Sequence, residues 1–102
     1  MICADLGVFY TVATDGGGTE ICYNWVHDND SSGSRSGIYL DNGTSNWLVH
    51  HNVVWDAGTA LQLNVPSNYI AAYNNTFIGN INQDFAWVFK TDTWGDRIIN
   101  NI

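Results

Sequence analysis

Asp28 and Asp56 are the two carboxylates whose spacing is most suggestive of acid and base chemistry. Each stands four residues after an Asn in a repeated segment, Asn24 for the first and Asn52 for the second. If these segments stack as adjacent turns, the carboxylates become neighbours, and their proximity raises one pKa or recruits a cation. If the chain is an enzyme, we expect general acid and base hydrolysis by Asp28 and Asp56 with His27 nearby. Two solvated turn carboxylates are the alternative.

The segment 28–33 could also bind calcium. It reads Asp-Asn-Asp-Ser-Ser-Gly, with oxygen-bearing side chains at alternate positions before a Gly, like the opening of a calcium loop. Asp28, Asp30 and Ser32 are the candidate ligands. The twelfth position is Tyr39, where an EF-hand has a bidentate Glu, so any calcium site here is expected to be a non-helical turn. The same residues are ordinary turn formers, so a metal-free turn is the alternative.

Aromatic side chains suggest a surface for sugar rings. Strand alternation predicts that Tyr39, Trp55 and Trp25 point outward, beside acidic and amide groups that can bond hydroxyls. We expect Tyr39, Trp55, Asp41 and Arg35 to bind the substrate. Packing between aromatic residues of adjacent turns is the alternative.

Thiol and imidazole groups form a weaker candidate site. Stacking of the repeats brings Cys22 beside His50 and His51, as in a zinc site or a Cys-His nucleophile. Zinc requires at least three protein ligands, and the next repeat offers none at this position. Cys22 could instead form a disulfide with Cys3, or both could be packed thiols.

These positions depend on a repeat that runs through the chain. Four segments superimpose on a shared Asn, with steps of 28, 23 and 26 residues: Asn24, Asn52, Asn75 and Asn101. A second apolar series has steps of 30, 23 and 26 residues: Val8, Ile38, Leu61 and Trp87. Such a period is typical of solenoids, in which each turn buries its apolar face against the next.

Within each segment apolar and polar residues alternate as in a strand with one buried face. Ile38 and Leu40 are expected to point inward, as are Trp87 and Phe89, and Trp47 is expected in the core. The repeated Asn residues are expected to form a hydrogen-bonded ladder, because an amide both donates and accepts. An immunoglobulin-like or jelly-roll sandwich is the runner-up fold, but it requires hairpins between neighbouring strands.

The segments 37–43 (GIYLDNG), 47–54 (WLVHHNVV) and 73–77 (YNNTF) resemble repeats of the pectin-lyase-like superfamily. The resemblance implies a right-handed parallel β-helix whose sites lie on the outer face of one sheet and in its loops. That superfamily includes lyases, hydrolases, epimerases, tailspikes and adhesins, so the fold does not determine the reaction. No catalytic signature of those enzymes is present in this sequence.

Composition narrows the classes of partner. Three basic residues against ten acidic ones give a net charge of −7, which excludes a phosphate-tracking nucleic-acid surface. No apolar run reaches membrane-spanning length. The abundance of Asn, Gly, Ser, Thr and aromatic residues is typical of secreted proteins that bind sugars. With so few cations, neutral sugars are expected, or calcium bridging to acidic ones.

The sequence therefore predicts an all-β, right-handed parallel β-helix of about four coils in a single domain, residues 1–102. We expect an extracellular or cell-surface excerpt of a longer solenoid that degrades a polysaccharide. A carbohydrate-binding module and a structural solenoid are the alternatives. Both ends look uncapped, which predicts association of copies through residues 1–12 and 85–102.

Overall fold

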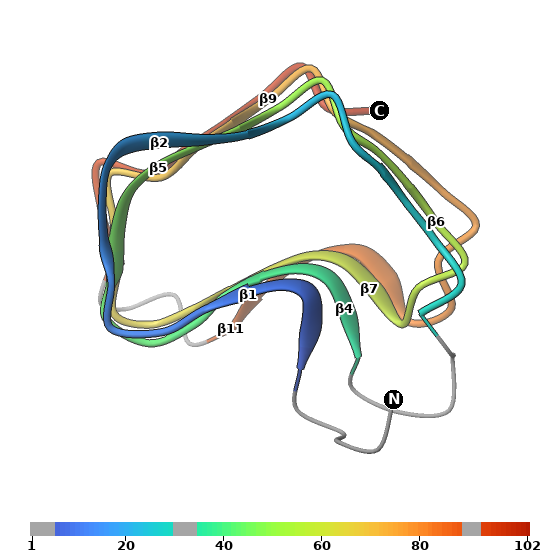
Figure 1. Cartoon of the computed structure of the whole chain (residues 1–102), viewed down its shortest axis with the longest axis horizontal. Helices are drawn as coiled ribbons and strands as arrows, with labels where there is room; N and C mark the ends of the chain where they lie inside the picture. Colours follow the sequence, from blue (N-terminus) through green and yellow to red (C-terminus); the bar gives the residue numbers. More distant parts are fainter. Residues whose placement is uncertain (1–5, 30–34, 89–92) are drawn as a thin grey trace.

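The chain is an all-β solenoid with no helix among the residues that the structure describes. The structure is a computed structural model of residues 6–29, 35–88 and 93–102, and it describes only the backbone of residues 86–88 and 93–94. Parallel strands stack into about three turns. Successive turns overlie one another and trace one shared outline (Figure 1). Within the described part, no helix is long and apolar enough to cross a membrane.

Three parallel sheets form the walls of the solenoid. The β4 sheet has the order β1-β4-β7-β11, the β6 sheet has the order β10-β6-β3, and the β5 sheet joins β12-β8-β5-β9-β13, with β2 also paired to β5. The strands are β1 (Gly7–Thr11), β2 (Asp15–Cys22), β3 (Trp25–Val26), β4 (Ser36–Leu40), β5 (Thr44–His50), β6 (Val53–Trp55), β7 (Thr59–Asn64), β8 (Ser67–Asn68), β9 (Ala71–Tyr73), β10 (Thr76–Ile78), β11 (Gln83–Val88), β12 (Thr93–Trp94) and β13 (Arg97–Ile99). All pairings between these strands are parallel, whereas a sandwich would contain antiparallel hairpins.

The register of β1 differs by one residue from the predicted repeat. Phe9, not Val8, pairs with Ile38. Val8 is 48% exposed, whereas Phe9 packs against the core. A shift of one residue reverses the face of a strand. The segment offers an apolar residue in either phase, which is why alternation alone selected the wrong one.

The register of β11 differs by two residues. Phe85 pairs with Leu61, and Trp87 pairs with Leu63. A shift of two keeps the same residues on the same face. The side chains of Trp87 and Phe89 lie outside the described residues, so their predicted inward orientation stays a prediction. Because the four strands of the β4 sheet span only three intervals, the chain makes about three turns instead of the predicted four.

An apolar core fills the space between the three sheets. Ile38, Leu40, Leu61 and Leu63 are fully buried there, as the alternation predicts. Trp47 packs against this core from the β5 sheet, also as predicted. Burial of each such aliphatic side chain contributes roughly 1.5–3 kcal/mol to folding.

A ladder of Asn side chains stabilises the corner between the β5 and β6 sheets, which confirms the predicted ladder. The Nδ2 atoms of Asn24, Asn52 and Asn75 each donate to the Oδ1 atom of the next Asn, at 3.0, 2.9 and 2.8 Å. The fourth member is Asn101. Each Oδ1 also accepts the backbone N–H of the preceding ladder residue, at 3.0–3.1 Å. The ladder therefore holds the same turn in place on every coil.

The residue before each ladder Asn has a left-handed backbone conformation. Tyr23, His51 and Asn74 have φ angles of 56°, 53° and 53°. Such angles are uncommon outside Gly and Asn, and a bulky aromatic residue adopts them at some cost. This turn directs the Tyr23 and His51 side chains away from the core, onto the outer corner beside the β5 sheet.

Candidate functional site

Trp25, His27 and Trp55 form an aromatic strip on the outer face of the β6 sheet. Val26 and Val54 are paired in β3 and β6 and are buried in the core. Residues adjacent to them along the chain therefore point outward: Trp25 and His27 flank Val26, and Trp55 follows Val54. The His27 and Trp55 rings stack with centroids 4.3 Å apart and planes 13° from parallel. The Trp25 ring meets Trp55 edge to face at 6.4 Å and is itself 79% exposed. The predicted outward orientation of Trp25 and Trp55 is confirmed.

Asp28 and Asp56 lie at equivalent positions on adjacent turns, next to the aromatic strip. The backbone N–H of Asn29 donates to the carbonyl oxygen of Asp56 at 3.2 Å, and Asn29 forms a parallel bridge with Ala57. Both Asp residues have left-handed φ angles, 55° and 50°. The two residues are therefore neighbours along the backbone, as predicted, whereas the proximity of their carboxyl groups stays a prediction. His27 Nδ1 lies 2.9 Å from Asp28 Oδ2, so one imidazole connects the aromatic and acidic parts of this surface.

Tyr39 and Asp41 are buried, so the prediction that they form a sugar-contacting surface is wrong. Tyr39 points away from the core but is only 2% exposed, and the Tyr10 ring packs against it. Asp41 accepts hydrogen bonds from Tyr10 Oη at 2.7 Å, Asn64 Nδ2 at 2.8 Å and the Asn42 N–H at 2.7 Å. Burial alone would raise the pKa of Asp41, but the hydrogen bonds to it outweigh burial and lower the pKa. Asp41 is a structural carboxylate.

The remaining predicted positions surround the 30–34 segment. Arg35 is half-buried immediately before β4. Asp30 and Ser32, two of the predicted calcium ligands, lie outside the described residues, so the calcium site stays a prediction. Asn29, beside the third ligand, is buried, and its Nδ2 donates to the Ser36 carbonyl oxygen.

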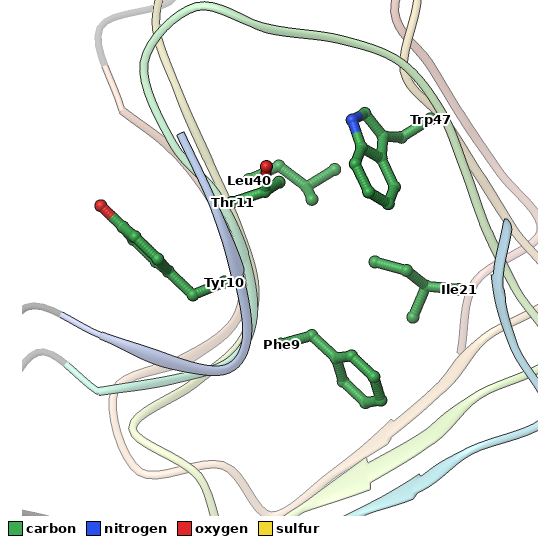
Figure 2. A pocket seen from close by; sticks show the side chains of 6 residues that line it. All are labelled: Phe9, Tyr10, Thr11, Ile21, Leu40 and Trp47. Carbon is green, nitrogen blue, oxygen red and sulfur yellow. The ribbon is translucent and has the colours of Figure 1, made fainter. Parts of the chain in front are cut away.

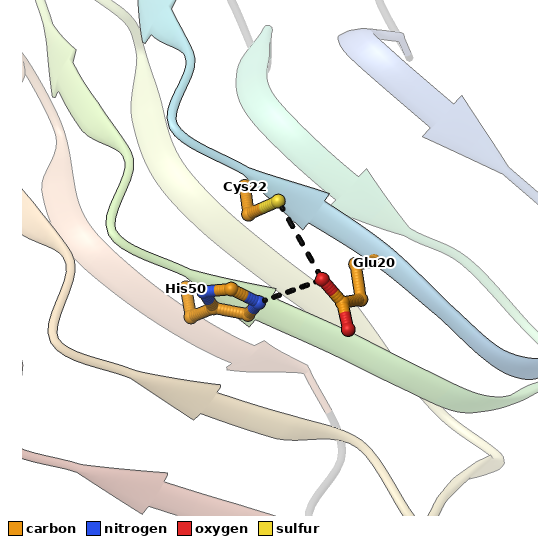
Figure 3. Close-up of side chains that lie close together, drawn as sticks. All are labelled: Glu20, Cys22 and His50. Carbon is orange, nitrogen blue, oxygen red and sulfur yellow. Dashed lines mark hydrogen bonds and ion pairs between the residues drawn. The ribbon is translucent and has the colours of Figure 1, made fainter.

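A second cluster, Glu20, Cys22 and His50, lies on the outer face of the β5 sheet (Figure 3). Cys22 and His50 are paired across β2 and β5, and Glu20 stands two residues before Cys22, so it shares the same face. Cys22 Sγ lies 3.7 Å from Glu20 Oε2, and His50 Nε2 lies 3.3 Å from the same oxygen. One ligand atom of each residue lies within 4.8 Å of the other two. Cys22 is a free thiol.

Neighbouring rings hold His50 in place. Its ring stacks on Tyr73 with centroids 4.8 Å apart and planes 11° from parallel. Its Nδ1 atom lies 2.9 Å from Nδ1 of His51, and the His51 ring stacks on Tyr23 at 5.1 Å. His50 is only 7% exposed, so its orientation is set by packing.

The repeat predicts that Cys22 lies beside His50, but it does not predict Glu20, because it relates residues on neighbouring turns and Glu20 lies on the same strand as Cys22. The alternation of side chains along β2 could have identified Glu20. Ile21 faces the core, so Glu20 and Cys22, on either side of it, both lie on the outer face. Desolvation and the Glu20 carboxylate raise the pKa of the Cys22 thiol.

The core also contains a small hollow, which is almost entirely apolar. Figure 2 shows Phe9, Ile21, Leu40 and Trp47 pointing into it, whereas Tyr10 points away. A sugar site needs polar groups that fix the orientation of hydroxyls. This hollow lacks a set of converging polar side chains among the residues that line it, so the outer faces are the better candidates.

The chain is a parallel β-solenoid, and the aromatic strip and the cluster of Glu20, Cys22 and His50 lie on separate outer walls. Comparisons with protein-family models, with curated proteins and with solved structures give no match for this chain.

Proposed function

We propose that the chain is a carbohydrate-binding part of a β-helix protein and that the aromatic strip contacts the sugar. The observation that carries the proposal is the Trp25 indole, 79% exposed and 6.4 Å from Trp55 on the adjacent turn. A large apolar ring left in solvent costs free energy unless a partner covers it, and the face of a sugar ring is a suitable partner. Asp28 and Asp56 stand beside these rings as acceptors for hydroxyl groups.

The charge of the chain favours a neutral polysaccharide. Uronate carboxylates are usually held by several cationic groups, whereas this chain has 3 basic residues against 10 acidic ones. The carboxylates beside the strip would repel an acidic sugar unless a cation bridged the two. We therefore expect neutral glycans to bind without added metal, and uronates to bind only with calcium.

A glycan array followed by calorimetry tests this proposal. The Trp25→Ala and Trp55→Ala variants should each weaken binding by about 1–3 kcal/mol, which is roughly 5- to 150-fold in Kd. Tyr69→Ala is the matched control, because Tyr69 is an exposed aromatic residue between β8 and β9 of the β5 sheet, away from the strip. Circular dichroism should show the same fold in all three variants. Unchanged affinity in both Trp variants would contradict the proposal.

Hydrolysis of the bound polysaccharide is a second candidate function, favoured by the positions of Asp28 and Asp56 on adjacent turns, next to the bridge between Asn29 and Ala57. Paired strands lie about 4.8 Å apart, and carboxyl groups about 5–5.5 Å apart serve retaining glycosidases. Release of reducing ends by the wild-type chain, abolished by Asp28→Asn and by Asp56→Asn, would support this reaction. Release that persists in both variants would contradict it.

The family and cellular setting follow as parts of the same proposal. The parallel solenoid and the repeats at 37–43, 47–54 and 73–77 support membership of the pectin-lyase-like superfamily. A polysaccharide partner implies an extracellular or cell-surface location. Association of copies through residues 1–12 and 85–102 stays a prediction, and parts of both segments lie outside the described residues.

A further inference from the structure

We infer that Glu20, Cys22 and His50 form a binding site for Zn²⁺, or for another divalent cation of the same coordination chemistry. The site lies on the outer face of the β5 sheet, whereas the aromatic strip lies on the β6 sheet. It therefore does not depend on the proposed carbohydrate binding.

The spacing of the three side chains fits one tetrahedral ion. With Zn–S near 2.3 Å and Zn–N and Zn–O near 2.0 Å, tetrahedral geometry separates sulfur from oxygen by about 3.5 Å and nitrogen from oxygen by about 3.3 Å. The corresponding separations are 3.7 Å between Cys22 and Glu20 and 3.3 Å between His50 and Glu20. The third pair, Cys22 and His50, lies within 4.8 Å, and a small rotation of the Cys22 side chain would close it.

The orientation of His50 also suits a metal ligand. A ligating His usually directs its second ring nitrogen to a hydrogen-bond acceptor, which fixes its tautomer. His50 Nδ1 lies 2.9 Å from His51 Nδ1, while Nε2 faces the Glu20 carboxylate. In the tautomer in which His50 Nδ1–H donates to His51, the Nε2 lone pair and a carboxylate oxygen face each other as two acceptors. A cation between them removes that repulsion.

One ligand of the proposed zinc site is held in place by packing, and the other two are accessible to solvent. His50 is buried and clamped by the Tyr73 ring, whereas Glu20 is exposed and Cys22 is half-buried. The ion can therefore enter from solvent and meet one preoriented imidazole. Three protein ligands leave a fourth position for water, the arrangement of zinc sites that bind or activate a small ligand.

Cobalt titration of the reduced full chain tests the site. Co²⁺ should bind one ion per chain, with a thiolate-to-metal charge-transfer band and the visible bands of tetrahedral cobalt, and Zn²⁺ should displace it. Cys22→Ser should abolish the charge-transfer band. Glu20→Gln, which is isosteric and exposed, should weaken Zn²⁺ at least about tenfold in competition with a chromophoric chelator.

Two control variants remove a thiol and an imidazole that are not part of the proposed zinc site. Cys3→Ser removes the other thiol, and His27→Gln removes an imidazole from the β6 sheet; both should leave the cobalt spectrum and the zinc affinity unchanged. Circular dichroism of Cys22→Ser and Glu20→Gln should match the wild type, since neither side chain is in the core. A band that survives Cys22→Ser, or a zinc affinity unaffected by Glu20→Gln, would overturn the inference.

Discussion

Replacement of Asn52 by Leu should destabilise the fold strongly, although the two side chains have the same number and branching of heavy atoms. Asn52 is 1% exposed, and its Oδ1 atom accepts from the backbone N–H and Nδ2 of Asn24 at 3.1 and 3.0 Å. Its Nδ2 atom donates to the Ile21 carbonyl oxygen and to Asn75 Oδ1, both at 2.9 Å. Leu keeps the branching of heavy atoms but forms none of these bonds, and its methyl groups need more space than the amide.

The magnitude follows from the groups that would be left without partners. Asn75 Oδ1 keeps a donor, the backbone N–H of residue 52, at 3.1 Å. The Asn24 N–H loses its acceptor, and an unpaired group costs about 1–3 kcal/mol; the Ile21 carbonyl oxygen loses one donor, and a lost hydrogen bond costs about 0.5–1.5 kcal/mol. The free energy of unfolding of Asn52→Leu should therefore fall by about 2–5 kcal/mol, a large fraction of the roughly 5–15 kcal/mol typical of a domain.

Urea denaturation followed by circular dichroism measures this loss. Asn74→Gly is the control, because Asn74 is an exposed Asn outside the ladder with a φ angle of 53° that Gly adopts readily. It should change the free energy of unfolding by less than about 1 kcal/mol. If Asn52→Leu were no more destabilising than Asn74→Gly, the ladder would not hold the coils together, and the reasoning would be refuted.

Three further predictions concern single residues, each checked by urea denaturation. Hydrogen bonds lower the pKa of Asp41 in the folded state. The stabilisation from its ionised form is therefore complete above the unfolded-state pKa of about 3.9 and is lost as the pH falls through the folded-state pKa. Asp41→Asn should destabilise the chain at pH 7 and make its stability less sensitive to acid. Burial raises the pKa of Asp96 despite the hydrogen bond from Ser67. Its ionisation therefore opposes folding once the pH rises above the unfolded-state pKa, and Asp96→Asn should stabilise the chain at pH 7. A lower free energy of unfolding for Asp96→Asn at pH 7 would contradict this. Gly37→Ala should cost about 1–3 kcal/mol, because its Cβ would lie 2.5 Å from Val54 Cγ1; an unchanged midpoint would show that the core adapts.

Repetition made part of the fold predictable from the sequence. A ladder needs the same side chain at the same place on every turn, so the same corner is marked four times, by Asn24, Asn52, Asn75 and Asn101. Once that corner is placed, the outward position of Trp25 follows from strand alternation. The neighbouring positions of Asp28 and Asp56 follow from the same count of residues.

Other features depend on contacts that the repeat does not specify. Tyr39 was expected on an exposed face because alternation distinguishes inside from outside but does not show whether neighbours cover the outside. Phe9 and Val8 are equally apolar, so the choice between two phases of β1 rested on packing. Glu20 joins Cys22 along one strand, a local relation that a search from turn to turn overlooks.

The central claim is that the aromatic strip contacts the sugar, and indole N–H resonances test it most directly. Titration of ¹⁵N-labelled chain with the best glycan from the array should shift the resonances of Trp25 and Trp55 along one saturating curve. The resonance of Trp47, which packs against the core, should stay in place and serves as an internal control. Saturable binding with no shift at Trp25 and Trp55 would contradict the claim and move the sugar site elsewhere on the solenoid.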